Sequence, residues 1–379
     1  MKKSLVILLV VCFVLSSFVG AFAKDIPDEV TIGMIGAISG AQALDGQNMQ
    51  DALKVLRSEI NDTITIDGKD VHVNWVYEDC EAKPEIAVNA AQKLVEQDHV
   101  IAIVGPNNSS DAIAAAAITQ DAEIPLISNT GTNIAVTQVG DYTFRACIID
   151  PFQGKVASKF AYDNLGYTKA AVIYDNADAY STGLYEAFAE AFEELGGEIV
   201  AAEAFSGADV RDYSAQLVNI KAANPEVVFV PCHIDNIPLI LQQIRGMGIE
   251  ADMLGCDSWD YDALPELVGL DVIEGAYYIT GFSPEAETAK DFVQKFEEMN
   301  GYQPSFCSAM MYEAASIVVN AIQNAETIDG TGVRDAIMAT DLDLPSGHVT
   351  FDEERNPIKS GVILQVLNGE RVYVTSVAP

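Results

Sequence analysis

The chain has 379 residues, of which 49% are apolar, and it carries a formal net charge of −35. This apolar content and length are enough for about two domains with substantial cores, which excludes a disordered chain despite the charge. The strong negative charge excludes nucleic acid and anionic membrane surfaces as partners, because both repel an acidic protein.

Residues 1–23 have the three parts of a secretory signal peptide. Two lysines precede the apolar run SLVILLVVCFVLSSFVG, and the small-residue motif AFA follows it. This pattern predicts export and cleavage after Ala23, and hence a periplasmic or extracytoplasmic protein. Cys12 follows Val11 where a lipoprotein signal needs a small residue, so lipidation is disfavoured. No later apolar run approaches the length of about 18 residues that predicts insertion into the membrane.

Short apolar runs alternate with helical patterns along the rest of the chain. In the first half, the predicted strands are 30–36, 71–79, 100–105 and 124–128, and helices follow the first three. The alternation then restarts, with strands at 169–175, 198–205, 226–232 and 251–257 and helices beginning near Tyr180, Asp212 and Asn236. Such alternation predicts parallel sheets with helices on both faces. Two runs of it predict two doubly wound, Rossmann-like α/β lobes.

The last hundred residues complete the lobes. They contain the stretch EGAYYITGFS (274–283), two or three helices between Glu285 and Ala339, and a hairpin of strands 361–367 and 371–377. Asn368-Gly369, between the two hairpin strands, is a strong turn signal. No low-complexity linker separates the lobes, so we expect the chain to cross between them on strands.

The stretch TIGMIGAISGAQALDGQ, from Thr31 to Gln47, has the strand, glycines and helix start of a nucleotide-binding turn. However, the tight G-x-G is absent, and the acid Glu78 lies too far along the chain to contact a ribose. Nucleotide binding is therefore disfavoured, and no cofactor is expected. The geometry still matters, because ligands of open α/β sheets bind beyond the carboxyl ends of the strands.

Polar residues gather at several such strand ends. GPNNSSDA places Ser109 at a helix start, where backbone N–H groups suit a carboxylate, although ordinary helix capping is the alternative. SNTGTN adds Thr130, Gly131 and Thr132 after the next strand. These two ends predict a small polar site on the first lobe.

The second lobe offers a different set of strand-end residues. Tyr180, His233, and Asp257 with Trp259 each follow one of its strands. Hydroxyl and N–H donors on one lobe, facing an acid and aromatic rings on the other, suit a zwitterion whose ammonium meets the acid.

Seven stretches carry a family resemblance through their order and spacing. They include IGAISGAQALDGQ, YEDCEAKPEIAVNAAQKLV, IVGPNNSSDAIAAAAI, IPLISNTGTNIAVT, YTFRACIIDPFQG, LGCDSWD and GYQPSFCSAMMYEAASIVVNAI. Across essentially the whole mature length, the chain resembles the substrate-binding proteins of branched-chain amino acid ABC transporters. The resemblance implies the type I periplasmic binding architecture, in which two lobes joined by three crossovers close on a ligand. It implies crossovers near Asp150, Thr280 and Pro357, with lobe 1 formed by 24–149 plus 281–357 and lobe 2 by 150–280 plus 358–379.

The resemblance also implies ligand contacts in the first lobe. Residues at the positions of Ser109 and Thr132 hold the carboxylate and ammonium of the amino acid in the family, with help from the backbone near Thr130 and Gly131. Asp45 stands where relatives carry an aromatic residue that closes over the ligand's side chain.

In the second lobe, the position of Asp257 carries the family's acid for the ammonium, and Tyr180 matches a tyrosine that lines the cleft. His233 replaces a tyrosine of the leucine/isoleucine/valine-binding members. Polar residues at both His233 and Asp45 weaken the case for a purely aliphatic ligand.

The cysteines do not predict a metal site or a disulfide framework. Cys232, His233, Cys256 and Asp257 fall at two neighbouring strand ends, but successive residues of a strand point to opposite faces and do not make a four-ligand site. Buried thiols or a Cys232–Cys256 disulfide are the simpler interpretations. Asn108 replaces a cysteine that pairs in some relatives, so Cys80 is expected to be free.

The sequence contains none of the motifs G-x-S-x-G, H-E-x-x-H or the P-loop, so catalysis is disfavoured. We expect an extracytoplasmic, monomeric solute-binding protein that captures an amino acid, branched-chain or related, and delivers it to a membrane ABC permease. The alternative is a ligand-sensing protein for an amino acid, an amide or another small carboxylate, working with a separate signalling partner.

Overall fold

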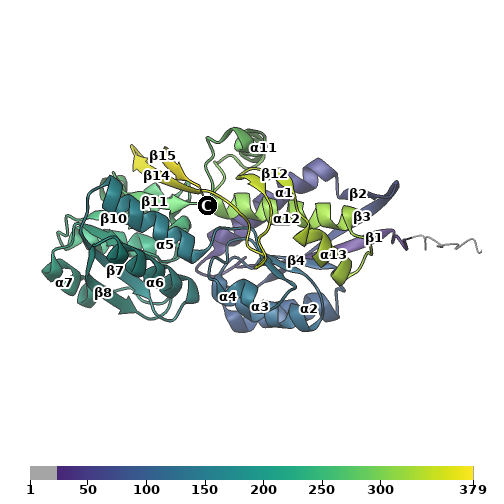
Figure 1. The fold of residues 1–379 in the computed structure, drawn as a ribbon, viewed down its shortest axis with the longest axis horizontal. Helices are drawn as coiled ribbons and strands as arrows, with labels where there is room; N and C mark the ends of the chain where they lie inside the picture. Colours follow the sequence, from purple (N-terminus) through teal and green to yellow (C-terminus); the bar gives the residue numbers. More distant parts are fainter. Residues whose placement is uncertain (1–23, 379) are drawn as a thin grey trace, which may run out of the picture.

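The computed structural model describes residues 24–378, which form two α/β lobes that lie side by side (Figure 1). The predicted signal peptide, residues 1–23, lies outside the described residues. Between residues 24 and 378, no helix combines the length and the apolar character needed to cross a membrane.

The first lobe is built on a six-stranded sheet with the strand order β2-β3-β1-β4-β5-β6. Only the β2–β3 pair is antiparallel. The strands are β1 (Glu29–Gly36), β2 (Thr63–Ile66), β3 (Lys69–Asp79), β4 (Ala102–Val104), β5 (Leu126–Ser128) and β6 (Thr143–Arg145). The helices of this lobe are α1 (Ala43–Ile60), α2 (Pro84–Glu96), α3 (Ser109–Asp121), α4 (Ala135–Gln138), α11 (Lys290–Asn300), α12 (Phe306–Asn324) and α13 (Gly330–Met338). The parallel strands β4 and β5 are buried along their whole length, as expected where helices cover both faces.

The second lobe has a seven-stranded sheet with the order β15-β14-β11-β10-β9-β7-β8. Its strands are β7 (Lys169–Asp175), β8 (Glu198–Phe205), β9 (Val227–Phe229), β10 (Asp252–Gly255), β11 (Tyr277–Thr280), β14 (Gly361–Leu367) and β15 (Glu370–Val377). Its helices are α5 (Asp150–Lys159), α6 (Ala179–Glu194), α7 (Ser214–Ala223), α8 (Ile237–Gly246), α9 (Leu264–Val268) and α10 (Leu270–Ile273). A π-helical segment (Phe160–Asn164) extends α5, and a 3-10 turn lies at Asp257–Trp259. A second 3-10 turn, Glu287–Ala289, lies beside α11 of the first lobe.

The chain crosses between the two sheets three times. It leaves the first sheet after β6, returns after β11 to helices that pack against the first lobe, and enters the second sheet again at β14. In particular, α12 packs along α1, so a late helix completes the early lobe. The predicted fold class, two doubly wound lobes with three crossovers, is thus confirmed. The boundaries at 149/150, 280/281 and 357/358 stay a prediction.

Several elements were not predicted. Besides β2 and the two-stranded sheet of β12 (Leu342–Leu344) and β13 (Gly347–Val349), these include α4, β6 and α5. All but α5 have only three or four residues, which show too little periodicity. The predicted C-terminal hairpin is present. Asn368 and Gly369 both have positive φ, 55° and 81°, as a tight hairpin turn between twisted strands requires.

A buried ion pair stabilises the third crossover. Lys359, just before β14, pairs with Glu313 of α12, and their side chains are 1% and 0% exposed. Glu313 also accepts a 2.6 Å hydrogen bond from the backbone N–H of Ser346. Because each charge is offset by the other, loss of either partner would leave an unpaired charge in the core.

Close approach of α5 and α6 depends on Gly154. A Cβ at this position would lie 2.6 Å from Cβ of Ala187 and 2.7 Å from the backbone nitrogen of Phe188.

We expect Gly154→Ala to lower the free energy of unfolding by about 1–3 kcal/mol, the usual cost of overpacking, as measured by urea denaturation. Gly246→Ala is the matched control, because a Cβ there meets open space at the end of α8. It should be neutral or stabilising by up to about 1 kcal/mol. Equal urea midpoints for the two variants would contradict the proposed helix contact.

Candidate functional site

A small cavity lies where the two lobes meet. Its lining residues are Asp45, Asn107, Asn108, Thr130, Tyr180, His233, Ile234, Asp257, Ser258, Tyr261, Phe306 and Cys307. The cavity volume is about 30 Å³, which is about the volume that one water molecule occupies in the liquid. Ligand pockets usually have a volume of about 300–1,000 Å³. The side chains of the two lobes therefore fill the space between them, and a ligand the size of an amino acid requires the lobes to separate.

Several hydrogen bonds across the lobes hold this closed arrangement, among them four made by the side chains of Ser110, Asn133, Gln42 and Tyr261. The first-lobe hydroxyl of Ser110 donates to Asp178 (2.9 Å), and the amide of Asn133 donates to the carbonyl of Ala179 (2.8 Å). Gln42 reaches Asp235 at 3.4 Å. The fourth bond runs from the hydroxyl of Tyr261 to the carboxylate of Asp45.

Asp45 lies in the first turn of α1, which approaches the end of β1 very closely. A Cβ on the next residue, Gly46, would lie 2.3 Å from the carbonyl oxygen of Ala37, so only glycine permits this approach. The approach brings Asp45 within 3.2 Å of the amide of Asn107, which follows β4. The strand-end loop and the helix start thus form one wall of the cavity.

The second lobe contributes a wall centred on Tyr180, at the start of α6. Its hydroxyl donates a 2.6 Å hydrogen bond to Asp257, which follows β10, and its ring stacks on His233 with 4.7 Å between ring centroids. The amide oxygen of Gln153 accepts from the backbone N–H of Asp257 at 3.3 Å. Asp257 is 3% exposed and therefore presents its carboxylate to the cavity rather than to bulk water.

Five of the eight predicted site residues line the cavity, namely Asp45, Thr130, Tyr180, His233 and Asp257. They come from both lobes, as a site between closing lobes requires. Their roles toward a ligand stay predictions.

Ser109, Gly131 and Thr132 do not line the cavity in this closed state. The hydroxyl of Ser109 accepts from the backbone N–H of Asn133 (3.2 Å), and the N–H of Gly131 donates to Ser128 (2.9 Å). The buried hydroxyl of Thr132 makes no hydrogen bond to any residue in 24–378.

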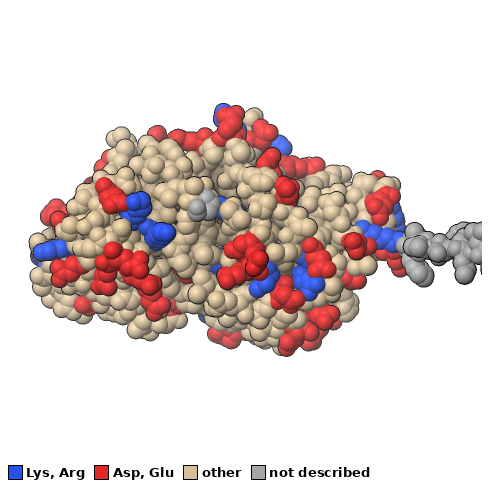
Figure 2. Space-filling model, viewed as in Figure 1, with Lys and Arg blue, Asp and Glu red and all other residues tan. Residues whose placement is uncertain are grey.

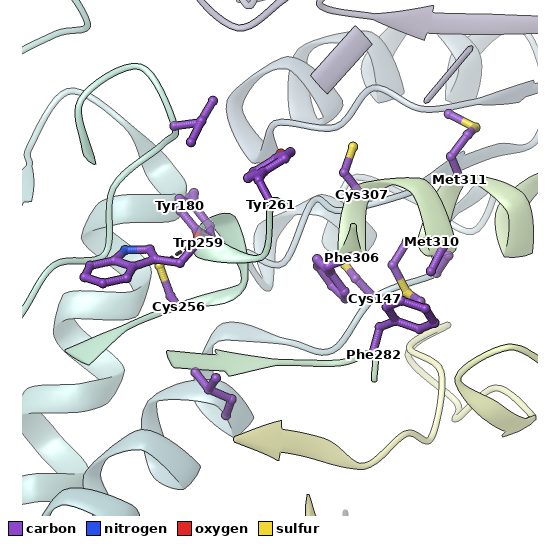
Figure 3. Close-up of a cluster of buried hydrophobic side chains, with 14 of the residues drawn as sticks. Cys147, Tyr180, Cys256, Trp259, Tyr261, Phe282, Phe306, Cys307, Met310 and Met311 are labelled. Carbon is purple, nitrogen blue, oxygen red and sulfur yellow. Dashed lines mark hydrogen bonds between the residues drawn. The ribbon is translucent and has the colours of Figure 1, made fainter. Parts of the chain in front are cut away.

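Of the twelve lining residues, seven were not among the predicted site residues, Asn107 and Asn108 included, and one aromatic ring was misplaced. Figure 3 shows Tyr261 between the loop that carries Trp259 and the start of α12, which carries Phe306 and Cys307. These contacts depend on how the lobes meet, which no local pattern reveals. Trp259, expected in the cleft, lies instead in the second-lobe core, where its indole N–H donates to the carbonyl of Val230 (3.1 Å). The other missed residues are Ile234 and Ser258.

Comparison with known proteins agrees with this arrangement. Residues 29–371 match a family model described as periplasmic binding protein. The chain belongs to the periplasmic binding protein family. It is 30% identical to an "Amino acid binding protein" of Pseudomonas aeruginosa, over 88% of this chain and 86% of the relative.

Two solved structures share the fold of this periplasmic binding protein. A leucine binding protein from Thermotoga maritima superimposes with a TM-score of 0.86 at 30% identity, over 92% of this chain and 99% of the other. A branched-chain amino acid transporter substrate binding protein from Streptococcus pneumoniae, in complex with isoleucine, gives a TM-score of 0.86 at 29% identity, over 93% and 100%. The resemblance drawn from the sequence is therefore confirmed, and so is the type I periplasmic binding architecture.

Both carboxylates in the cavity of this periplasmic binding protein are harder to ionise than usual. Burial raises the pKa of Asp45 to about 6, against the opposing effect of the hydrogen bond from Tyr261. Burial also raises the pKa of Asp257 to about 6, although hydrogen bonds from Tyr180 and Gln153 oppose it. Above pH 6, both groups carry their charge at an energetic cost that an additional cation would relieve.

The two cysteines beside the cavity are separate thiols. Cys232 and Cys256 are buried and unlinked, so the interpretation as buried thiols holds and the disulfide is wrong. Burial raises the pKa of the Cys256 thiol to about 12, which keeps it protonated and unreactive at neutral pH. Cys80 is also free, as expected.

His233 is held as a cation by Asp178. Burial alone would lower its pKa, but the charge of Asp178, whose Oδ2 lies 3.2 Å from Nε2, outweighs burial and raises the pKa to about 9. Asp235 and Asp45 add to this effect. At neutral pH, His233 and Asp178 therefore form an internally neutral pair.

This ion pair predicts where His233 titrates. In an NMR pH titration, its ring signals should change near pH 9 rather than near the usual value of about 6.5. Because the folded-state pKa is raised, the stabilisation from the pair is complete below about pH 6.5 and is lost as the pH rises toward 9. Asp178→Asn keeps a capping side chain for α6 but removes the charge, so it should lower the pKa of His233. An unchanged titration in this variant would contradict the pairing.

Proposed function

We propose that this chain captures an α-amino acid, branched-chain or related, between its two lobes and delivers it to a membrane ABC permease outside the cytoplasm. Binding involves no covalent chemistry, and the protein acts as a monomer. The names of its relatives and the closed two-lobe geometry support this proposal.

One observation carries the proposal, namely the buried carboxylate of Asp257 in the wall of the cavity. A carboxylate at the end of a second-lobe strand would receive the ammonium of a ligand held between the two lobes. The hydroxyl of Tyr180, 2.6 Å away, fixes its orientation. An ammonium here would replace the water that closure removes from the carboxylate.

The first lobe supplies groups for the opposite end of a zwitterion. Helix α3 begins at Ser109, beside the lining residue Asn108, and Asn108 makes no side-chain cap to the helix. The first N–H groups of a helix lack partners within it, and the helix dipole favours an anion there. The buried hydroxyl of Thr132, which lies close to the carboxylate of Asp150, is a further donor of this lobe that would turn from Asp150 to reach a ligand. A ligand carboxylate at α3 and an ammonium at Asp257 would join the two lobes.

Asp257→Asn tests the ammonium contact, because it keeps the shape and removes the charge. We expect a loss of about 2–5 kcal/mol in binding, which is about 30-fold or more in affinity. Calorimetry at pH 8, where Asp257 is ionised, should compare the best amino acid with its deaminated analogue. The variant should lose the preference for the amino acid.

Asp262→Asn is the control for Asp257→Asn. Asp262 lies five residues further along and is 51% exposed outside the cavity, so its loss should leave the preference intact. If Asp257→Asn weakens both ligands equally, or neither, Asp257 is not the partner of the ammonium.

Delivery to a permease is separately testable. Affinity purification of the tagged protein from membranes of its own organism, with saturating ligand, should recover an ABC permease. Recovery of a sensor subunit in its place would contradict delivery and support the ligand-sensing alternative.

A further inference from the structure

The charged residues in the wall of the cavity are unbalanced. Among the lining residues, the acids are Asp45 and Asp257, and the only basic side chain is His233. The imidazole of His233 is already paired with Asp178 at 3.2 Å. Neither cavity carboxylate therefore has a cation of its own.

An ordinary zwitterion neutralises only one of these two acids. On the proposed function, the α-ammonium meets Asp257, and the α-carboxylate meets donors at the start of α3. Asp45 then stays buried, 4% exposed, with hydrogen bonds from Tyr261 and Asn107; the charge of His233 acts on it, but His233 is paired with Asp178. A buried carboxylate whose hydrogen-bond donors are all neutral costs free energy that a cation in direct contact would recover.

The surroundings of Asp45 are suited to a chain that ends in a cation. The apolar side chains of Ile234 and Phe306 line the same cavity and offer contacts for methylene groups. The backbone carbonyl of Asp45 is itself in contact with the thiol of Cys307, 3.8 Å away. In the closed structure, the hydroxyl of Tyr261 from the second lobe occupies the place beside the Asp45 carboxylate.

We propose that the cavity selects a ligand with a second positive charge, an amino acid whose side chain ends in an ammonium or guanidinium group, and that Asp45 receives this group. The inference rests on the proposed capture of an α-amino acid, and it assigns that amino acid a cationic side chain in place of a branched-chain one. A carboxylate accepts several hydrogen bonds, so Asp45 binds the cation while Tyr261 or Asn107 still donates to it.

The ionisation of the neighbouring groups supports this assignment. The pKa of Asp45, raised to about 6 by burial, leaves it ionised at pH 8, where lysine and arginine side chains are cationic. Burial and the charge of Asp45 hold the pKa of Tyr261 well above its usual value, so Tyr261 stays a neutral donor. The other charged groups that act on Asp45 are His233, Asp235 and Asp257, and two of these three are acids.

Three ligands of similar chain length test the inference by calorimetry on the mature chain at pH 8. Lysine has an α-ammonium, an α-carboxylate and a side-chain ammonium. Norleucine lacks the side-chain ammonium, and cadaverine lacks the α-carboxylate. We expect lysine to bind about tenfold or more tighter than norleucine, the value of hydrogen bonds to a charged group. Asp45→Asn should remove this preference while norleucine binding is retained, which also shows that the variant is folded.

Asp51→Asn is the matched control. Asp51 is a buried carboxylate on the same helix as Asp45, accepts a 2.7 Å hydrogen bond from the side-chain amide of Gln47, and does not line the cavity. This variant should keep the preference for lysine over norleucine. If both variants lose the preference for lysine, the preference comes from the combined electrostatic potential of the buried acids. That result would overturn the specific role of Asp45.

The remaining outcomes separate the inference from the proposed function. Norleucine binding as tightly as lysine would overturn the inference and leave the proposed function standing. Cadaverine binding as tightly as lysine, with loss in Asp45→Asn, would support the cation site but contradict recognition of an amino acid. If none of the three ligands binds, the inference is overturned.

Discussion

The structure depends on the burial of two carboxylates, one from each lobe, in the same small space. Asp45 enters from α1 and Asp257 from the end of β10, and both are nearly inaccessible to solvent when the lobes meet. Each has a tyrosine hydroxyl from the second lobe as its nearest donor, Tyr261 for Asp45 and Tyr180 for Asp257. A neutral hydroxyl offsets only part of the free energy that is lost when a carboxylate is removed from water. The closed state is therefore less stable when no cation contacts these two carboxylates. On the proposed function, the charge of the ligand and the closure of the lobes would therefore be coupled.

An ion pair outside the cavity holds the loop that carries Tyr261 in place. Arg371 of β15 binds Asp260 at 2.6 Å and also reaches the carbonyl of Pro304, just before α12. This contact joins the loop that carries Tyr261 to the helix that carries Phe306 and Cys307. The loop and the start of this helix lie side by side in Figure 3. A cation thus bridges two loops behind the site, whereas the cavity itself has no lysine or arginine. Arg371 therefore stabilises the loops around the cavity, and the residues that line the cavity itself are acidic or neutral apart from His233.

The sequence predicted most of the fold because parallel strands covered on both faces appear as apolar runs between helices, and 169–175 and 198–205 match β7 and β8 residue for residue. The site was predicted in part. Strand ends and the family resemblance pointed to His233 and Asp257, and the resemblance alone pointed to Asp45. Tyr261 and Phe306 were missed because they meet only when the lobes close. Trp259 was misplaced because a 3-10 turn after β10 directs its ring into the core.

The charge of the whole molecule acts in the same direction as the charge of the cavity. Acidic side chains are spread over the face shown in Figure 2, with few basic ones, in keeping with the net charge of −35. The potential of such a surface raises the local concentration of cations and lowers that of anions, most strongly at low salt. Inside, a second ligand carboxylate would meet Asp45 or Asp257 with no cation available to offset the repulsion. On the proposed function, the surface and the cavity would therefore both disfavour binding of a dicarboxylate.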